Sequence, residues 1–168
     1  MNPSAKVMLL GDIGVGKSSL ARRLVFDRFE SEYKTTLGVD VLTHDVDLGQ
    51  AGVEAKLRLI LWDTDGDFGV RIFETVYVRG ASGAIIVADA SRPGTLVKMA
   101  HLAQGFSERF PGRPVQNVVN KIDLLRPGQS IETGDADLGE ALFSSALTGE
   151  GVAKAFVTLG AAILRRGL

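Results

Sequence analysis

The sequence has no cysteine and only two histidines, His44 and His101. The absence of thiols excludes a disulfide framework, a cysteine-ligated metal and thiol chemistry. Two histidines far apart in the sequence also make a poor metal site. Because prenyl and palmitoyl groups are attached to cysteine thiols, no direct lipid anchor is expected.

Charge of one sign and long apolar runs are equally scarce. The 19 Lys and Arg face 20 Asp and Glu, which leaves a net charge of −1. No basic run is long enough to follow a phosphate backbone, so nucleic acid is not expected as a partner. The longest apolar stretches have the length of a strand rather than of a membrane span, and no signal pattern opens the chain. A cytoplasmic location is therefore expected.

What the sequence does contain is short apolar runs that alternate with longer helical patterns. With 168 residues, 45% of them hydrophobic, the chain can form a domain that buries about 70% of its unfolded surface. The alternation predicts an α/β fold with a mainly parallel sheet and helices on both faces. Strands are predicted near 7–10, 83–90, 115–123 and 140–146, and helices near 16–26, 68–78, 95–109 and 151–166.

A β-hairpin is predicted between the first strand and the segment at 83–90. Apolar residues alternate with charged ones over 53–61, which is typical of a strand with one dry and one partly wet face. The segment before it, 39–48, leads into the turn sequence GQAG at 49–52. Since hairpin strands are antiparallel, this unit adds one antiparallel strand at the edge of the sheet.

The stretch GDIGVGKSS, Gly11 to Ser19, fits the pattern G-x-x-x-x-G-K-[ST] between a strand and a helix. Its glycines let the backbone N–H groups converge on phosphates, Lys17 reaches the β- and γ-phosphates, and Ser18 offers its hydroxyl to Mg²⁺. The alternative is a glycine-rich turn without a ligand. The nucleotide-binding residues predicted in this loop are Gly14, Val15, Gly16, Lys17, Ser18 and Ser19.

The sequence NKID follows a buried apolar run, at the edge where ligands bind in α/β sheets. The Asp123 carboxylate can accept from guanine N1–H and N2–H, whereas adenine has no matching pair of donors. Guanine is therefore favoured, although NKID by itself also suits an ordinary loop. Lys121 can lie along the purine and Asn120 can tie this loop to the phosphate loop. The segment SSAL, with Ser145, Ala146 and Leu147, can present a backbone N–H to guanine O6.

These motifs together resemble those of the Ras-superfamily small GTPases, and most closely the Rab branch, over nearly the whole chain. The resemblance also rests on YKTTLGVD at 33–40, WDTDG at 62–66 and YVRGASGAIIVAD at 77–89, in matching order. It implies a P-loop NTPase of the small G-domain type over 1–168, with a six-stranded sheet that has one antiparallel edge strand. It further implies a GTP/GDP switch that uses Mg²⁺, contacts effectors and regulators through two switch segments, and is a monomer or weak dimer.

The resemblance also implies roles for single residues. Thr36 would sense Mg²⁺ and the γ-phosphate, Asp63 would hold Mg²⁺ through water, and the Gly66 N–H would bond the γ-phosphate. Phe29 would flank the base and Tyr33 would cover the phosphates. The implied metal residues are Ser18, Thr36 and Asp63, and the implied catalytic residues are Lys17, Thr36, Gly66 and Asp67.

Two acidic residues distinguish this chain from the family where hydrolysis takes place. The family has DTAGQE, and this chain has DTDGDF, so that Asp67 replaces the glutamine that orients water and Asp65 replaces an alanine. An ionised Asp67 only accepts hydrogen bonds and repels γ-phosphate oxygens, which predicts slow intrinsic hydrolysis. The alternatives are that Asp67 acts as a general base or donates with a raised pKa, or that hydrolysis is lost. A P-loop kinase or ATPase is disfavoured by NKID.

Further departures lie at the rim of the predicted site. Ile13 crowds the approach of an arginine finger, and Leu147 replaces the lysine that the family places after SA. The segment 124–144 is glycine-rich and shorter than the family's helix-bearing connection, so its helix is expected to be truncated or missing. It is either a harmless deletion or a specialised partner surface. The stretch 68–78 has more apolar side chains than one helix face buries, which predicts an exposed apolar patch for partners.

Overall fold

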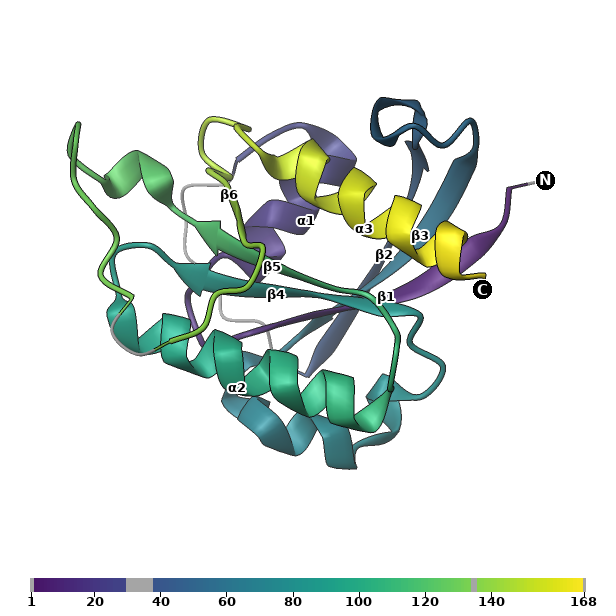
Figure 1. Ribbon diagram of the computed structural model, residues 1–168, viewed down its shortest axis with the longest axis horizontal. Coiled ribbons are helices and arrows are strands. Elements are labelled where there is room, and N and C mark those ends of the chain that lie inside the picture. The colour runs from purple at the N-terminus through teal and green to yellow at the C-terminus, as the bar shows by residue number, and fades with distance from the viewer. Residues whose placement is uncertain (1, 30–37, 134–135, 168) are drawn as a thin grey trace.

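A six-stranded sheet in the order β2-β3-β1-β4-β5-β6 forms the centre of the computed structural model (Figure 1), which describes residues 2–29, 38–133 and 136–167. Only β2 is antiparallel to its neighbour, and every other pair is parallel. The predicted sheet with one antiparallel edge strand is therefore confirmed. The strands are β1 (Ser4–Gly11), β2 (Val39–Asp47), β3 (Lys56–Thr64), β4 (Gly83–Asp89), β5 (Val115–Asn120) and β6 (Leu142–Phe143).

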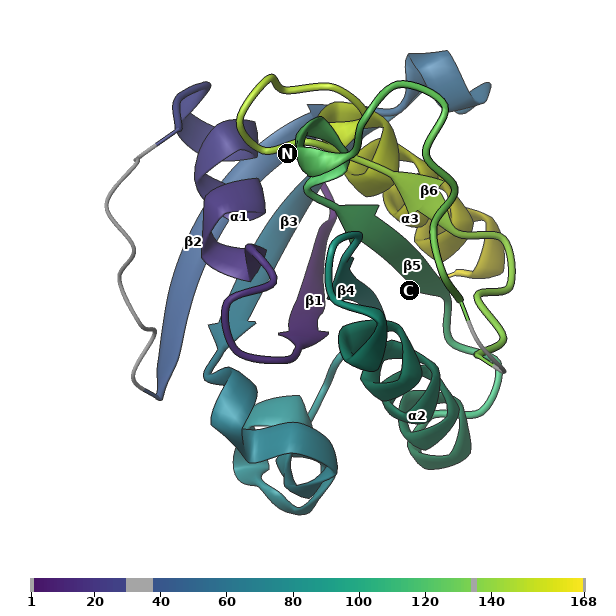
Figure 2. The same ribbon diagram turned by 90° about the vertical axis from the view of Figure 1, so that its left-hand side faces the viewer.

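Helices cover both faces of the sheet, as Figure 2 shows. On one face α1 (Lys17–Phe26) and α3 (Val152–Arg166) pack over a core that includes Val7 and Leu9. On the other face α2 (Pro93–Arg109) packs over Met8 and Leu10. Successive side chains of a strand point to opposite faces, so the unbroken apolar run of β1 supplies both cores.

The predicted hairpin is present, with its second strand shifted by three residues, from 53–61 to Lys56–Thr64. β2 and β3 pair from Val39 opposite Thr64 to Asp47 opposite Lys56. The 3₁₀ turn η1 (Gly49–Ala51) connects them, and the Leu48 N–H closes the loop on the Ala55 carbonyl at 2.9 Å. The strand therefore begins at Lys56, because residues 53–55 belong to this loop closure.

The helix predicted at 68–78 is wrong: the chain there forms two 3₁₀ segments, η2 (Gly66–Glu74) and η3 (Val76–Val78). Gly69 has φ 52° and ψ −140°, and Thr75 is extended, so neither continues an α-helix. The expected exposed apolar side chains are present, because Val70 is 57% exposed and Val76 62% exposed.

The connection from β5 to β6 holds no α-helix in the part that the structure describes. This agrees with the prediction that the helix of this short connection is truncated or missing. Its only helical turn among those residues is η4 (Ile122–Leu124), which follows β5 directly. β6 has two residues, fewer than the predicted strand at 140–146. None of the described helices is both long enough and apolar enough to cross a membrane.

Candidate functional site

The loop between β1 and α1 carries the predicted phosphate-binding sequence. Gly16 is the N-cap of α1 with φ 102°, and Gly14 has φ 75°. These left-handed conformations strain any residue with a Cβ, which explains both glycines. The loop thus ends at a helix N-terminus, where free N–H groups and the helix dipole favour an anion.

Lys17 is folded back over this loop. Its side chain is buried, and Nζ donates to the carbonyls of Gly11 and Asp12, both at 3.0 Å. Burial lowers the pKa of the Lys17 ammonium, while the nearby charges of Asp63 and Asp12 oppose this shift. An ammonium held at the mouth of the loop is suited to phosphate oxygens.

Asp63 and Ser18 lie together beside the loop and fit the chemistry of a magnesium site. Asp63 is 2% exposed, its Oδ2 accepts from the Ser18 hydroxyl, and its buried Oδ1 has no hydrogen-bond partner among the residues that the structure describes. Burial raises the pKa of the Asp63 carboxyl, and the Ser18 bond and the Lys17 charge oppose this. Mg²⁺ is usually held by one or two protein oxygens with substrate phosphates. That pattern agrees with the lack of any three-residue His, Cys, Asp or Glu cluster among the described residues.

Asn120 joins three segments of the predicted site. Its Nδ2 donates to the Val15 carbonyl at 3.0 Å, and its Oδ1 accepts from the Ser144 hydroxyl at 3.0 Å and the Ala146 N–H at 3.2 Å. The side chain is 1% exposed, so these bonds satisfy a buried amide. The phosphate loop, NKID and SSAL therefore meet through one side chain, as predicted for Asn120.

Lys121 and Asp123 extend this meeting point. Lys121 has φ 66°, and its Nζ donates to the Gly14 carbonyl at 2.7 Å. The Asp123 Oδ1 accepts from the Ser145 hydroxyl at 2.7 Å, while the residue itself is exposed. Leu147 is 49% exposed at the same rim. Asp123 thus exposes a carboxylate on the loop that Asn120 and Lys121 join to the phosphate loop; its role in recognising a base stays a prediction.

The segment that follows β3 lies against the phosphate loop. A Cβ on Gly66 would come within 2.5 Å of the Ile13 nitrogen, so only glycine allows this approach. The Asp67 N–H donates to Asp65 Oδ1 at 2.9 Å, and Arg71 donates to the Asp67 carbonyl at 3.1 Å. A hollow of about 400 Å³ adjoins these residues. The acidic pair Asp65 and Asp67 is thus placed next to the loop, and Asp67 is exposed.

Three predicted residues stay untested by the structure. Tyr33 and Thr36 lie outside the described residues. Phe29 is 38% exposed, three residues beyond the end of α1. Their predicted roles at the phosphates and the base stay predictions.

Sequence reasoning missed three residues that support the site. Asp89, at the end of β4, bonds Arg92 at 3.0 Å and Lys121 at 3.2 Å. Arg23 of α1 donates to the carbonyls of Ala146 and Leu147 at 2.8 and 2.6 Å. Asp89 had a usable signal, because a carboxylate at the carboxyl end of a buried parallel strand faces the ligand edge. The bonds of Arg23 to Ala146 and Leu147, and of Arg92 to the Ile13 carbonyl at 2.8 Å, had none, since these acceptors are backbone atoms distant in sequence.

Comparison with known proteins agrees with these motifs. The profile of the family described as Ras of Complex, Roc, domain of DAPkinase matches residues 6–123. The chain is similar to the GTP-binding protein ypt5 of Schizosaccharomyces pombe, with 32% identity over 161 residues, 92% of this chain and 75% of ypt5. It is also similar to the Ras-related protein SEC4 of Saccharomyces cerevisiae, with 34% identity over 92% of this chain and 72% of SEC4. The Ras-related protein Rab-5B of Plasmodium falciparum is 30% identical over 96% of this chain and 78% of Rab-5B.

Proposed function

The chain belongs to the Rab-like branch of the Ras-superfamily GTPases, and on this premise we propose that it is a Mg²⁺-dependent guanine-nucleotide switch that hydrolyses GTP slowly. Residues 1–168 act as a single G domain, in the cytoplasm, as a monomer or weak dimer. Effectors and regulators contact the two switch segments, where Val70 and Val76 expose apolar surface.

The observation that carries this proposal is the position of Asn120. Its amide bonds the phosphate loop at Val15 and the SSAL segment at Ser144 and Ala146. A phosphate-binding loop and a base-recognition loop built on one side chain form a single nucleotide site rather than two separate turns. This supports the choice of guanine, because Asp123 stands on the same loop with an exposed carboxylate.

Each side chain has a distinct task in holding the nucleotide. The N–H groups of the loop and the Lys17 ammonium bind the phosphates, and Asp123 pairs with N1–H and N2–H of guanine. Ser18 and the unpartnered Oδ1 of Asp63 are the described groups that would hold Mg²⁺ near the phosphates. The metal, when bound, neutralises charge on phosphate oxygens. The close approach of the Gly66 backbone to the loop at Ile13 supports a role for the Gly66 N–H in bonding the γ-phosphate.

Slow hydrolysis follows from the charge of Asp67. An ionised carboxylate accepts a hydrogen bond from water but cannot donate one to the transferring phosphoryl group. The negative charge of the Asp67 carboxylate also repels the negatively charged oxygens of the γ-phosphate. Asp65 accepts from the Asp67 N–H at 2.9 Å, which holds a second carboxylate in the same turn.

A nucleotide-binding module that has lost hydrolysis is the second candidate, and this Asp65 to Asp67 bond favours it. The bond caps the start of η2 and holds the Asp67 backbone beside the second carboxylate, which concentrates negative charge in this turn. Both candidates bind GTP and GDP, and they differ only in whether the bound GTP is cleaved.

Single-turnover cleavage of Mg²⁺·GTP on nucleotide-free protein separates these candidates. We expect slow cleavage by the wild type and a rate about tenfold higher or more for Asp67→Gln, with a further gain when Asp65→Ala is added. Glu54→Gln removes an equal charge from the far end of the β2–β3 hairpin and serves as the control, with an unchanged rate. Absence of cleavage in all variants that bind GTP would favour the second candidate. Slower cleavage by Asp67→Gln would make Asp67 itself the base.

A further inference from the structure

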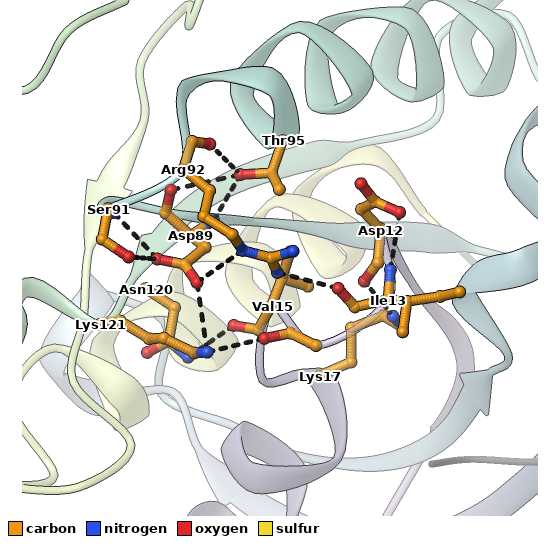
Figure 3. Close-up of polar contacts among 11 residues, drawn as sticks. Asp12, Ile13, Val15, Lys17, Asp89, Ser91, Arg92, Thr95, Asn120 and Lys121 are labelled. Carbon is orange, nitrogen blue, oxygen red and sulfur yellow. Dashed lines mark hydrogen bonds and ion pairs between the residues drawn. The ribbon is translucent and has the colours of Figure 1, made fainter.

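Three consecutive carbonyls of the phosphate loop are each held by a side chain from elsewhere in the fold (Figure 3). Arg92 Nη2 donates to the Ile13 carbonyl at 2.8 Å, Lys121 Nζ to the Gly14 carbonyl at 2.7 Å, and Asn120 Nδ2 to the Val15 carbonyl at 3.0 Å. The donors come from the start of α2 and from the end of β5 and the residue after it. The carbonyls of residues 13, 14 and 15, on the outer side of the loop, thus each accept a hydrogen bond from one of these side chains.

These bonds determine where the next N–H groups point. A trans peptide is planar, and its C=O and N–H point in opposite directions. A carbonyl held on the outer side therefore turns the N–H of the following residue to the inner side. This applies to the N–H groups of Gly14, Val15 and Gly16, for which no acceptor is found among the described residues. The inner side is where the phosphates are expected.

Arg92 is itself held in place by Asp89. Arg92 Nε donates to Asp89 Oδ2 at 3.0 Å, and Lys121 approaches the same oxygen at 3.2 Å. The other oxygen accepts from the N–H and hydroxyl of Ser91 at 2.9 and 2.6 Å. Burial opposes ionisation of the carboxyl, but the bonds from Ser91, Arg92 and Lys121 outweigh it and lower the Asp89 pKa. A buried, ionised Asp89 thus orients two of the three side chains that hold the loop.

We propose that Asp89 and Arg92 form a positioning pair that fixes the Ile13–Gly14 peptide, aims the Gly14 N–H at the nucleotide phosphates and slows nucleotide release. Arg92 is a positioning residue, because it acts through the loop backbone and does not touch the nucleotide. This inference rests on the proposed binding of a guanine nucleotide.

The guanidinium is suited to this task in a way that an ammonium is not. Nε and Nη2 lie in one rigid plane and reach two acceptors, the Asp89 carboxylate and the Ile13 carbonyl, at the same time. A lysine at this position offers a single nitrogen on a flexible stem, so it can hold the carbonyl only weakly. Arg92→Lys therefore tests geometry separately from charge.

Lys98 provides the matched control for charge. It also belongs to α2 and also contacts the loop, with Nζ 3.1 Å from Asp12 Oδ1. Its side chain is 55% exposed and that of Arg92 is 45% exposed, so solvent screens both cations to a similar degree. Lys98, however, bonds the Asp12 carboxylate, whose Oδ1 also accepts from the Ile13 N–H at 2.8 Å, and contacts none of the carbonyls of residues 13–15.

The test is the release of a fluorescent GDP from the wild type, Arg92→Ala, Arg92→Lys and Lys98→Ala in the presence of Mg²⁺. We expect release from Arg92→Ala to be about threefold to tenfold faster, since one charge-assisted hydrogen bond at a half-exposed site is lost. Arg92→Lys is expected to recover part of this loss, and Lys98→Ala to stay within about twofold of the wild type. The ³¹P resonance of the bound β-phosphate is expected to move in Arg92→Ala, and the preference for GDP over XDP to stay unchanged.

Asp89→Asn provides a second variant in case Arg92→Ala folds poorly. It preserves the shape and removes the charge that orients Arg92, so its release is also expected to be faster. The double variant is expected to release GDP no faster than Asp89→Asn alone, because both changes act on one contact.

Each other outcome has a defined meaning. Equal acceleration in Arg92→Ala and Lys98→Ala would show that charge alone matters and would overturn the positioning role. Unchanged release in both Arg92→Ala and Asp89→Asn would overturn the pair while leaving the nucleotide switch intact. A wild type that binds no guanine nucleotide would overturn the proposed function and, with it, this inference.

Discussion

Gly16 shows how a single missing Cβ allows the site to exist. It has φ 102°, and a Cβ placed on it would lie 2.3 Å from the Nδ2 of Asn120. Asn120 cannot yield, because it is buried and bonds Val15, Ser144 and Ala146. The glycine is therefore required both by its backbone conformation and by the close approach of the base-recognition loop.

We predict that Gly16→Ala lowers the affinity for GDP at least about tenfold and destabilises the fold by about 1–3 kcal/mol. The added methyl group strains the backbone and displaces Asn120 from the Val15 carbonyl. Titration with fluorescent GDP and urea unfolding measure the two effects. Gly94→Ala is the control: nothing lies within 4 Å of its Cβ position, so affinity should not change and stability should rise slightly.

At the scale of elements, α2 contacts both the phosphate loop and the 3₁₀ segment η2. Its N-cap residue Arg92 and Lys98 in its second turn contact the phosphate loop. Further along, Gly105 lies against the ring of Phe73 in the 3₁₀ segment η2. A mid-helix glycine costs about 1 kcal/mol relative to alanine. Here the cost is explained by the close approach of η2, since a Cβ on Gly105 would lie 2.6 Å from the Phe73 ring.

We predict that Gly105→Ala pushes Phe73 outward and gives a net destabilisation of about 0–2 kcal/mol, since overpacking exceeds the gain in helix propensity. Urea unfolding measures this. Adding Phe73→Leu should relieve the clash, so that the double variant is more stable than Phe73→Leu alone by about the propensity gain of 1 kcal/mol. If Gly105→Ala alone proves stabilising, the packing of η2 on α2 is looser than the structure indicates.

At the scale of the whole molecule, the site lies across the carboxyl ends of several strands. The phosphate loop connects β1 to α1. Asp63 is the next-to-last residue of β3, and Asp89 and Asn120 are the last residues of β4 and β5. A ligand bound there contacts segments that are separated by the full width of the parallel sheet. Binding should therefore stabilise the whole fold rather than one loop.

We predict that GDP with Mg²⁺ raises the free energy of unfolding by about 2.7 kcal/mol at a free concentration one hundred times its Kd. Urea unfolding with and without nucleotide measures this gain. In Asp123→Asn the gain should shift from GDP toward XDP, because an amide can donate to the extra carbonyl oxygen of xanthine. An unchanged response to GDP in that variant would contradict the placement of guanine at Asp123.

The sequence alone was sufficient for the parts of the structure that follow from local pattern. The spacing of GDIGVGKS between an apolar run and a helical one predicted the loop, and alternating residues with the turn at 49–52 predicted the hairpin and its antiparallel edge strand. Local pattern succeeds there because strand alternation and glycine conformation depend on neighbours within a few residues. It failed at 68–78, where the apolar spacing resembled a helix but Gly69 and Thr75 interrupt it.

Only the tertiary structure determined which side chains hold the phosphate loop. Asn120 was predicted to contact it, because NKID follows a buried strand at the edge where ligands bind in α/β sheets, whereas Arg92 and Asp89 were not. Arg92 donates to a carbonyl 79 positions earlier in the sequence, and backbone carbonyls carry no sequence signature. The physical reason is that such a bond depends on the relative placement of β1, β4 and α2, which the packing of the two cores sets and no local spacing encodes.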